Sequence, residues 1–327
     1  MLDNHHRVIN YLRLSVTDRC NLRCIYCMPE QGVRFMPHSE ILTYEEMLHI
    51  VDLCMEQGIR KVRLTGGEPL VRKGFIGFVE RLGKIEGLDE ITLTTNGVLL
   101  KEFAHALRNC GIFRINVSMD TLQPDRFRQI TRRDDYDRVW EGIEEAERAG
   151  FNPIKLNVVA MRGINDDEVL DFARLTWEKP YHVRFIELMP VGRGNSFWTA
   201  ERFIPAREIF NRIRAIGSLK PIARNPLDGP AERYSFEGAQ GEIGFIGALS
   251  HHFCETCNRL RLTADGHLRA CLFSDRETDL KTPLREGKGD GYLLNLIKTT
   301  RQNKPANHGL RESGPCKCTY RMNRIGG

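Results

Sequence analysis

Short β-branched segments alternate with amphipathic segments over the first 190 residues, and this alternation restricts the possible folds more than any other feature. Helices are predicted from the capping box of Thr43 and Glu46 up to Gly58, and at residues 75–85, 101–110, 136–149 and 166–177. Strands are predicted at residues 8–17, 61–65, 90–95, 112–118, 154–161 and 182–189. Six such units favour a parallel sheet with right-handed crossovers, and they are fewer than the eight of a closed barrel. We therefore expect an α/β fold, a partial TIM barrel of the (β/α)6 type.

The composition changes after about residue 190, where the regular alternation stops. Residues 191–199 are rich in glycine and loop-like. Helices are predicted at 205–216, 279–286 and 291–301, a strand at 242–246, and a hairpin over 260–272 that turns at Asp265 and Gly266. We expect two domains: residues 1–190 form the barrel, and residues 191–327 form an α+β cap over its open side.

Three cysteines, Cys20, Cys24 and Cys27, lie in the loop after the first predicted strand. This is the end of the barrel where active sites are built. Thiolates are the usual ligands of iron–sulfur clusters, and three of them leave one iron of a four-iron cluster open to a small molecule. The alternative is a zinc site that lacks a nearby fourth ligand.

A second group, Cys254, Cys257 and Cys271, lies more than 220 residues further along the chain. It also offers three thiolates, and the alternative is a structural zinc site completed by His251 or His252. Ten cysteines in a chain of this kind do not indicate a disulfide framework. Cys54 and Cys110 fall in helical patterns and are expected to be small core residues.

The first cysteine group, with the spacing Cys-x3-Cys-x2-Cys, resembles the signature of the radical S-adenosylmethionine (SAM) superfamily. Tyr26 stands where that superfamily places an aromatic residue beside the adenine. The segment 66–69, GGEP, follows the second predicted strand and resembles the glycine-rich motif that meets the amino group of SAM. Glycine there lets backbone approach closely.

The second cysteine group carries a more specific resemblance, which extends over almost the whole chain. Residues 257–266, CNRLRLTADG, resemble the GTP 3′,8-cyclase family of molybdenum cofactor biosynthesis. The resemblance includes 11–20, YLRLSVTDRC, and also 63–69, 94–97, 116–120, 155–157, 184–190, 321–322 and 325–327.

This resemblance implies a role for each matched residue. Cys20, Cys24 and Cys27 would hold one [4Fe–4S] cluster, and Cys254, Cys257 and Cys271 would hold a second. Tyr26, Gly67, Ser118 and Met189 would contact SAM, while Gly326 and Gly327 would enter the catalytic pocket. The residues implied to bind GTP are Arg13, Arg63, Thr94, Lys155, Arg259 and Arg261.

The activity implied by the resemblance is that of a lyase. It converts GTP to 3′,8-cyclo-7,8-dihydro-GTP, uses an electron donor, and passes its product to cyclic pyranopterin monophosphate synthase. One alternative is a peptide-modifying radical SAM enzyme with an auxiliary cluster, although the run Asn258–Arg261 argues against it. Another is a non-catalytic zinc-binding protein.

Composition indicates where the chain acts and which kinds of partner it meets. No apolar run approaches 18 residues and no secretory signal precedes the first strand, so we expect a cytoplasmic protein with no membrane partner. The net charge of +5 is spread along the chain and does not indicate nucleic acid. Residues 298–327 hold seven Lys or Arg and one acid, which fits either a solvated basic tail or cations facing a polyanion. The sequence does not fix the oligomeric state, and a homodimer is among the options.

Two features depart from the family pattern. Residues 248–252, ALSHH, replace a proline-containing segment expected before the second cysteine group, which leaves the shape of that loop open. Cys316 and Cys318 do not belong to the pattern, and we interpret them as exposed tail thiols prone to oxidation.

Overall fold

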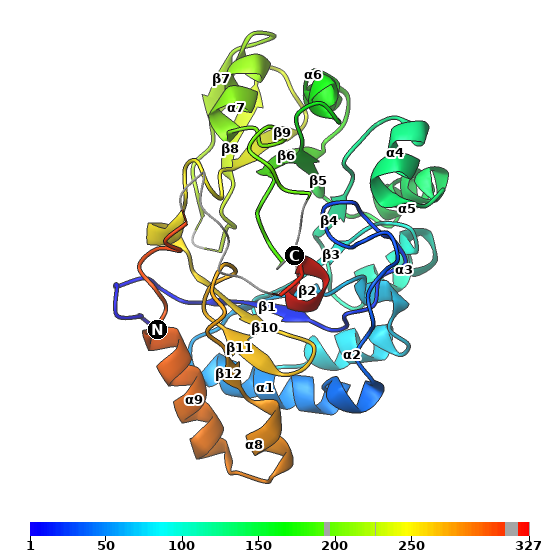
Figure 1. The fold of residues 1–327 in the computed structure, drawn as a ribbon. Coiled ribbons are helices and arrows are strands. Elements are labelled where there is room, and N and C mark those ends of the chain that lie inside the picture. Colours follow the sequence, from blue (N-terminus) through cyan, green and yellow to red (C-terminus); the bar gives the residue numbers. More distant parts are fainter. Residues whose placement is uncertain (193–196, 226, 311–319, 327) are drawn as a thin grey trace.

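The computed structural model describes residues 1–192, 197–225, 227–310 and 320–326. Its strands form one continuous sheet, in the order β12-β11-β10-β1-β2-β3-β4-β5-β6-β9-β8-β7 (Figure 1). The six central strands follow the sequence order and are parallel throughout. They are β1 (Tyr11–Ser15), β2 (Lys61–Thr65), β3 (Glu90–Thr95), β4 (Ile115–Ser118), β5 (Ile154–Ala160) and β6 (His182–Glu187).

The second half of the chain extends this sheet at both edges. Strand β9 (Glu242–Ile246) runs parallel to β6, and β10 (Arg259–Leu262) runs parallel to β1. Antiparallel strands complete the edges: β8 (Glu232–Phe236) and β7 (Leu219–Pro221) beyond β9, and β11 (His267–Arg269) and β12 (Thr278–Asp279) beyond β10. The edge strands β12 and β7 do not pair with each other, so the barrel is open, as predicted.

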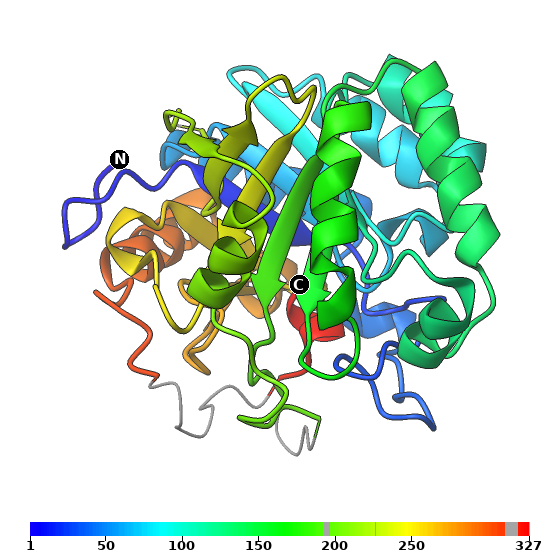
Figure 2. The same ribbon diagram turned by 90° about the horizontal axis from the view of Figure 1, so that it is seen from above.

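The helices between the central strands cover the outside of the curved sheet (Figure 2). They are α1 (Tyr44–Glu56), α2 (Phe75–Leu82), α3 (Leu100–Asn109), α4 (Pro124–Thr131), α5 (Tyr136–Arg148) and α6 (Val169–Glu178). The predicted capping box is present: Thr43 Oγ1 accepts the Glu46 N–H, and the Glu46 carboxylate accepts the Thr43 N–H.

The remaining helices belong to the second half of the chain. They are α7 (Ala206–Arg214), α8 (Lys281–Arg285), α9 (Asp290–Gln302) and the short α10 (Met322–Ile325). Four 3₁₀ turns are also described: η1 (His38–Glu40), η2 (Pro69–Val71), η3 (Asp166–Glu168) and η4 (Cys254–Thr256). In Figure 1, α10 lies at the centre of the molecule, over β1 and β2.

The sequence analysis missed one helix of the barrel, α4. Its signal was weak because only Phe127 and Ile130 supply apolar contact, and two arginines follow. Pro124 at the first turn is a start signal that could have identified it. Other differences are shifts of element ends: the first strand, predicted at 8–17, is confined to Tyr11–Ser15, and the helix predicted at 166–177 begins as the 3₁₀ turn η3.

None of the described helices combines the length and the apolar character needed to cross a membrane.

The packing of α3 against α5 yields a stability test at Gly142. A Cβ at Gly142 would lie 2.6 Å from the Gly97 carbonyl oxygen and 3.0 Å from Leu100 Cβ. Gly142→Ala should therefore lower the free energy of unfolding by about 1–3 kcal/mol through overpacking. Gly77 in α2 is the matched control, because a Cβ there meets nothing within 4 Å. Gly77→Ala should raise that free energy by up to about 1 kcal/mol through helix propensity. Urea denaturation of both variants checks the contrast, and equal effects would contradict it.

Candidate active site

A single cavity opens at the carboxyl ends of the parallel strands and reaches both groups of cysteines. Most residues singled out from the sequence line it. They are Arg13, Cys20, Cys24, Tyr26, Cys27, Arg63, Gly67, Thr94, Ser118, Met189, Cys254, Cys257, Arg259, Arg261 and Cys271. Lys155 and Gly326 lie outside this lining. Gly327, Cys316 and Cys318 fall outside the described residues.

The loop that carries the first cysteine group is fixed by α4, the helix that the sequence analysis missed. The backbone N–H groups of Arg23 and Ile25 donate to the carbonyls of Thr131 and Ile130, each at 2.9 Å. Burial raises the pKa of Cys20 to about 11 and that of Cys27 to about 12. These buried thiols favour the protonated form, so a bound cation is needed to hold them as thiolates.

The glycine-rich motif lies directly against this loop. Gly67 N–H donates to the Thr17 carbonyl, and Glu68 N–H donates to the Arg19 carbonyl, both at 2.7 Å. A Cβ at Gly67 would lie 2.2 Å from the Arg19 carbonyl oxygen, so only glycine allows this approach. The buried Glu68 carboxylate accepts Thr95 Oγ1–H at 2.8 Å and the Asn96 N–H at 2.6 Å. Burial raises the pKa of Glu68 to about 7.

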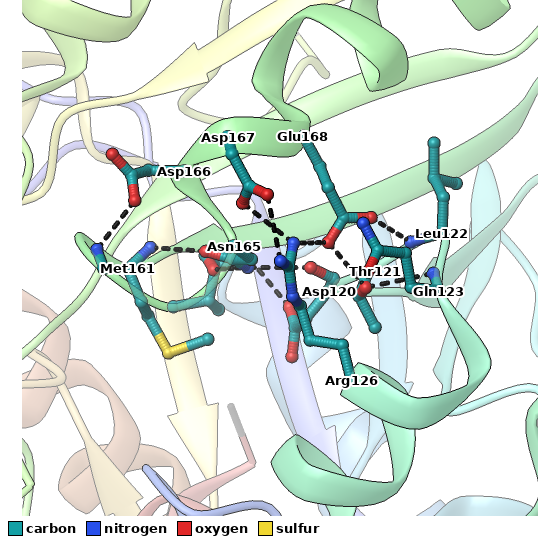
Figure 3. Close-up of polar contacts among 12 residues, drawn as sticks. Asp120, Thr121, Leu122, Gln123, Arg126, Met161, Asn165, Asp166, Asp167 and Glu168 are labelled. Carbon is teal, nitrogen blue, oxygen red and sulfur yellow. Dashed lines mark hydrogen bonds and ion pairs between the residues drawn. The ribbon is translucent and has the colours of Figure 1, made fainter.

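Tyr26, predicted to contact adenine, is held by Asp120, which follows β4. The Tyr26 hydroxyl donates to Asp120 Oδ2 at 2.7 Å, and Val159 N–H donates to Asp120 Oδ1 at 2.8 Å. Asn165 Nδ2 donates to the backbone carbonyls of Asp120 at 2.7 Å and Val159 at 2.9 Å (Figure 3). Burial raises the pKa of Asp120 to about 6, although its two hydrogen bonds act the other way.

A second buried carboxylate in Figure 3, that of Glu168, fixes the segment between Asp120 and α4. It accepts Thr121 Oγ1–H at 2.7 Å and the Leu122 N–H at 2.6 Å, and it pairs with Arg126. Arg126 also bonds Asp167 Oδ1 at 2.8 Å. The start of α6 thus supports the loop that leads into α4, and α4 in turn supports the first cysteine group.

The second cysteine group comes together from η4, the residues just before β10 and the residues just after β11. Cys257 N–H donates to the Cys254 carbonyl at 3.2 Å. Burial raises the pKa of Cys254. Burial alone would also raise the pKa of Cys257, but the positive charges of Arg259 and Lys304 bring it down to about 6. The surroundings of Cys257 therefore favour its thiolate form.

The segment at 248–252, which departs from the family pattern, has a defined anchor. Glu187 at the end of β6 is buried and accepts the Leu249 N–H at 2.7 Å and the Ser250 N–H at 3.1 Å. The same carboxylate accepts the Ala206 N–H at 2.7 Å, at the start of α7. Without proline, this loop is therefore held by a carboxylate that also fixes α7.

Ligand atoms of the kinds that hold metals lie closest together at one further place in the site. Within the described ranges, one set of three His, Cys, Asp or Glu side chains has all its ligand atoms within 4.8 Å of one another: His252, Cys254 and His308. The three thiols of each cysteine group are spaced more widely than this. His308 Nδ1 accepts the Leu310 N–H at 3.0 Å, which in the neutral ring leaves the hydrogen on Nε2. In that form His308 is not arranged as a metal ligand.

Cations line the cavity between the two cysteine groups. The sheet register aligns Arg13 on β1 with Arg63 on β2 and with Arg261 on β10. Arg63 Nη1 donates to Thr94 Oγ1 at 3.3 Å, and Arg63 Nε pairs with the Tyr11 hydroxyl. Burial lowers the pKa of Arg13 to about 10. This concentration of positive charge in one cavity suits a polyanion.

Lys155 lies on β5, behind the lining of this cavity, where it is buried among further cations. Burial, with the charges of Arg184 and Arg63, lowers its pKa to about 6. Arg184 does line the cavity, and the sequence analysis gave it no role. On β6 it pairs in register with Asn157 on β5 and with Gly244 on β9, and this pairing is visible only in the structure.

The C-terminal segment reaches the same cations. The Gly326 carbonyl accepts Arg261 Nη1–H at 2.7 Å and Arg13 Nη2–H at 3.4 Å. Asn323 Nδ2 donates to the Asp18 carbonyl at 3.0 Å, beside the first cysteine group. A Cβ at Gly326 would lie 2.7 Å from Thr65 Cγ2, so glycine is needed at this point.

Several lining residues were missed because sequence reasoning cannot show which loops converge. They are Tyr11, Asn116, Asp120, Asn157, Lys304 and His308. Asn116 and Asn157 continue the inward-facing positions of their strands, which is a usable signal. Lys304 and His308 come from the segment after α9 and carry no such signal.

Comparison with known proteins agrees with this site. The radical SAM superfamily matches residues 14–176, and Molybdenum Cofactor Synthesis C matches residues 181–310. The GTP 3′,8-cyclases of Pelotomaculum thermopropionicum and Desulforamulus reducens are 51% and 50% identical to the chain. Both alignments cover 100% of this chain and 100% of the relative.

Among solved structures, Streptococcus suis SuiB bound to S-adenosylmethionine has a TM-score of 0.60 and 13% sequence identity. The match covers 95% of this chain and 77% of SuiB, and at this identity it shows the fold alone. With full-length relatives at about half identity and both cysteine groups in one cavity, the chain belongs to the GTP 3′,8-cyclase family of the radical SAM superfamily.

Proposed function

We propose that the chain is a lyase that converts GTP to 3′,8-cyclo-7,8-dihydro-GTP, the first step of molybdenum cofactor biosynthesis. The observation that carries this proposal is the shared cavity, in which arginines stand between two groups of three cysteines. The names of the full-length relatives support the substrate. The direct test is anaerobic incubation with SAM, dithionite and GTP, followed by mass spectrometry of the product.

In this proposal the first cysteine group holds a [4Fe–4S] cluster. With SAM bound, that cluster supplies a 5′-deoxyadenosyl radical able to take the hydrogen from C3′ of GTP. Tyr26, Gly67, Ser118 and Met189 hold SAM. The fixed pairing of Tyr26 with Asp120 supports this role, because a pre-oriented ring pays less ordering entropy when it binds.

The second cysteine group would hold a further [4Fe–4S] cluster, whose open iron would recognise the guanine base. Arg13, Arg63, Thr94, Lys155, Arg259 and Arg261 bind GTP, with guanidinium groups as bidentate partners for phosphate oxygens. The burial of Arg63 and Arg261 in the cavity wall supports the assignment, since buried cations need a counter-charge. Enclosure in the barrel also keeps water from the substrate radical.

The proposal extends to the surroundings of the enzyme. It acts in the cytoplasm, takes electrons from a low-potential donor, and hands its product to cyclic pyranopterin monophosphate synthase. A homodimer is among the options for its oligomeric state, and sedimentation of the reconstituted protein distinguishes it from a monomer.

The two cysteine groups should assemble clusters independently, because they come from separate loops. Cys24→Ala should abolish SAM cleavage yet keep one cluster, at about half the iron. Cys257→Ala should also keep about half the iron, and should still cleave SAM slowly without cyclising GTP. Iron and sulfide analysis with 5′-deoxyadenosine assay measures both. Loss of all iron from either soluble variant would be inconsistent with two sites.

GTP should bind far more tightly than guanosine, because the cations meet charge on the triphosphate. Each charge-assisted contact contributes roughly 1.5–3 kcal/mol, so losing several should weaken binding by orders of magnitude. ATP should not be converted if the second cluster recognises guanine. Calorimetry and product assays test the two points separately. Equal turnover of ATP and GTP would exclude base recognition, and equal affinity for guanosine would exclude the phosphate role.

The tail should act in cyclisation rather than in folding. A protein without Gly326 and Gly327 should keep both clusters and should still cleave SAM without coupling to GTP. Its rate of GTP cyclisation should fall by about tenfold to a hundredfold for each lost bond to Arg13 or Arg261. Gly326→Ala should act in the same direction through its contact with Thr65. Gly77→Ala in α2 is the control, and it should leave GTP cyclisation unchanged. A truncated protein that cyclises GTP at the full rate would show that the tail is dispensable.

A further inference from the structure

Residues 304–306 are tied to the second cysteine group by one buried guanidinium, that of Arg7. Its Nη1 donates to the carbonyls of Cys254 at 2.8 Å and Ala306 at 3.3 Å. Its Nη2 donates to the carbonyls of Lys304 at 3.1 Å and Pro305 at 2.9 Å. Asp3 neutralises Arg7, with Nε to Oδ2 at 2.7 Å, and both side chains are buried. The position of this segment relative to Cys254 is therefore fixed.

The fixed segment places a buried cation, the Lys304 ammonium, beside the other two cysteines. Its Nζ donates to the Arg259 carbonyl at 2.9 Å and to the Ala270 carbonyl at 2.5 Å. Arg259 lies two residues after Cys257, and Ala270 directly precedes Cys271. Lys304 is 3% exposed and lines the cavity. Burial lowers its pKa, and the charges of Cys257 and Cys271 act against this, so the ammonium and the thiolates stabilise each other.

Lys304 differs from the other cations of the site in what it bonds. Arg13 and Arg261 bond the Gly326 carbonyl. Arg259 bonds the Cys257 thiol and lies over the Phe253 ring, with its guanidinium carbon 4.8 Å from the ring centroid. Lys304 Nζ donates instead to two backbone carbonyls beside the cysteines. Its charge is therefore a constant feature of the second cysteine group, whether or not the cavity holds a polyanion.

The first cysteine group has charged neighbours of both signs. Glu68 and Asp120 are buried carboxyl groups near Cys20 and Cys24, while Arg23 Nη1 donates to the Cys20 carbonyl at 2.5 Å. Reduction of a [4Fe–4S] cluster adds one electron and one negative charge. Nearby cations stabilise that added charge and nearby anions oppose it, so the local charge helps to set the reduction potential.

We propose that Lys304 is a positioning residue for electron transfer, whose fixed charge raises the reduction potential of the second cluster. This inference rests on the proposed second cluster. The step is the uptake of one electron by the cluster, with no bond formed or broken. The electron comes from a low-potential one-electron donor, which is oxidised.

The test is an anaerobic redox titration of the full chain with dithionite, followed by electron paramagnetic resonance. The Cys24→Ala and Cys257→Ala proteins identify the signal of each cluster. Lys304→Gln keeps N–H donors for the two carbonyls and removes the charge, and Lys304→Met removes both. Lys101→Gln on the exposed face of α3 is the matched control, since that side chain pairs only with the solvent-exposed Glu141 among the described residues.

The expected result is a more negative midpoint potential for the second cluster in Lys304→Gln and Lys304→Met, with full iron content. The first cluster should keep its potential, and Lys101→Gln should change neither. An unchanged second potential, or an equal shift of both clusters, would overturn the proposal. Loss of the second cluster from both Lys304 variants would assign the residue to assembly and would also overturn it. If the Cys24→Ala protein held no iron, no second cluster would form. That result would contradict the proposed function, and the role of Lys304 would fail with it.

Discussion

Several positively charged side chains lie close together inside this barrel. The site depends on the groups that offset the repulsion between them. The Tyr11 hydroxyl lies between Arg63, Arg13 and Lys61. Burial would raise its pKa, but these cations bring it down to about 7. Lys61 is further paired with Glu90 at 2.8 Å. Partial ionisation of Tyr11 thus balances part of the charge, and the remaining positive charge makes the cavity electropositive.

Buried carboxylates connect each loop at the mouth of the barrel to a neighbouring one. Glu68 after β2 accepts the backbone N–H after β3, and Asp120 after β4 accepts an N–H of β5. Glu168 bonds the loop before α4, and Glu187 at the end of β6 bonds two segments of the second half. Carboxylates that accept N–H groups form strong, charge-assisted bonds. The loops at the open end of the barrel are therefore held together by buried carboxylates, while cations line the cavity between them.

The sequence predicted those parts of the fold that depend on local periodicity and on spacing. Strands β2, β3 and β9 were predicted with their observed ends, and the cysteine groups with their companion arginines converge on one cavity. The pairing of strands far apart in the sequence could not be predicted, because nothing in residues 242–246 or 259–262 indicates that they join opposite edges of the barrel sheet. Lys304 and Arg7 were missed for the same reason, because their importance lies in carbonyls contributed by distant segments.

The bond between the Gly326 carbonyl and Arg261 has a thermodynamic consequence. Two of the guanidinium groups proposed for GTP already have a partner within the same chain, and each carries further N–H groups that the Gly326 carbonyl does not use. The carbonyl holds one edge of each guanidinium, so a ligand that binds the remaining N–H groups meets side chains that are already oriented and loses less ordering entropy. Because linkage is reciprocal, such a ligand would strengthen the attachment of the tail by the same factor.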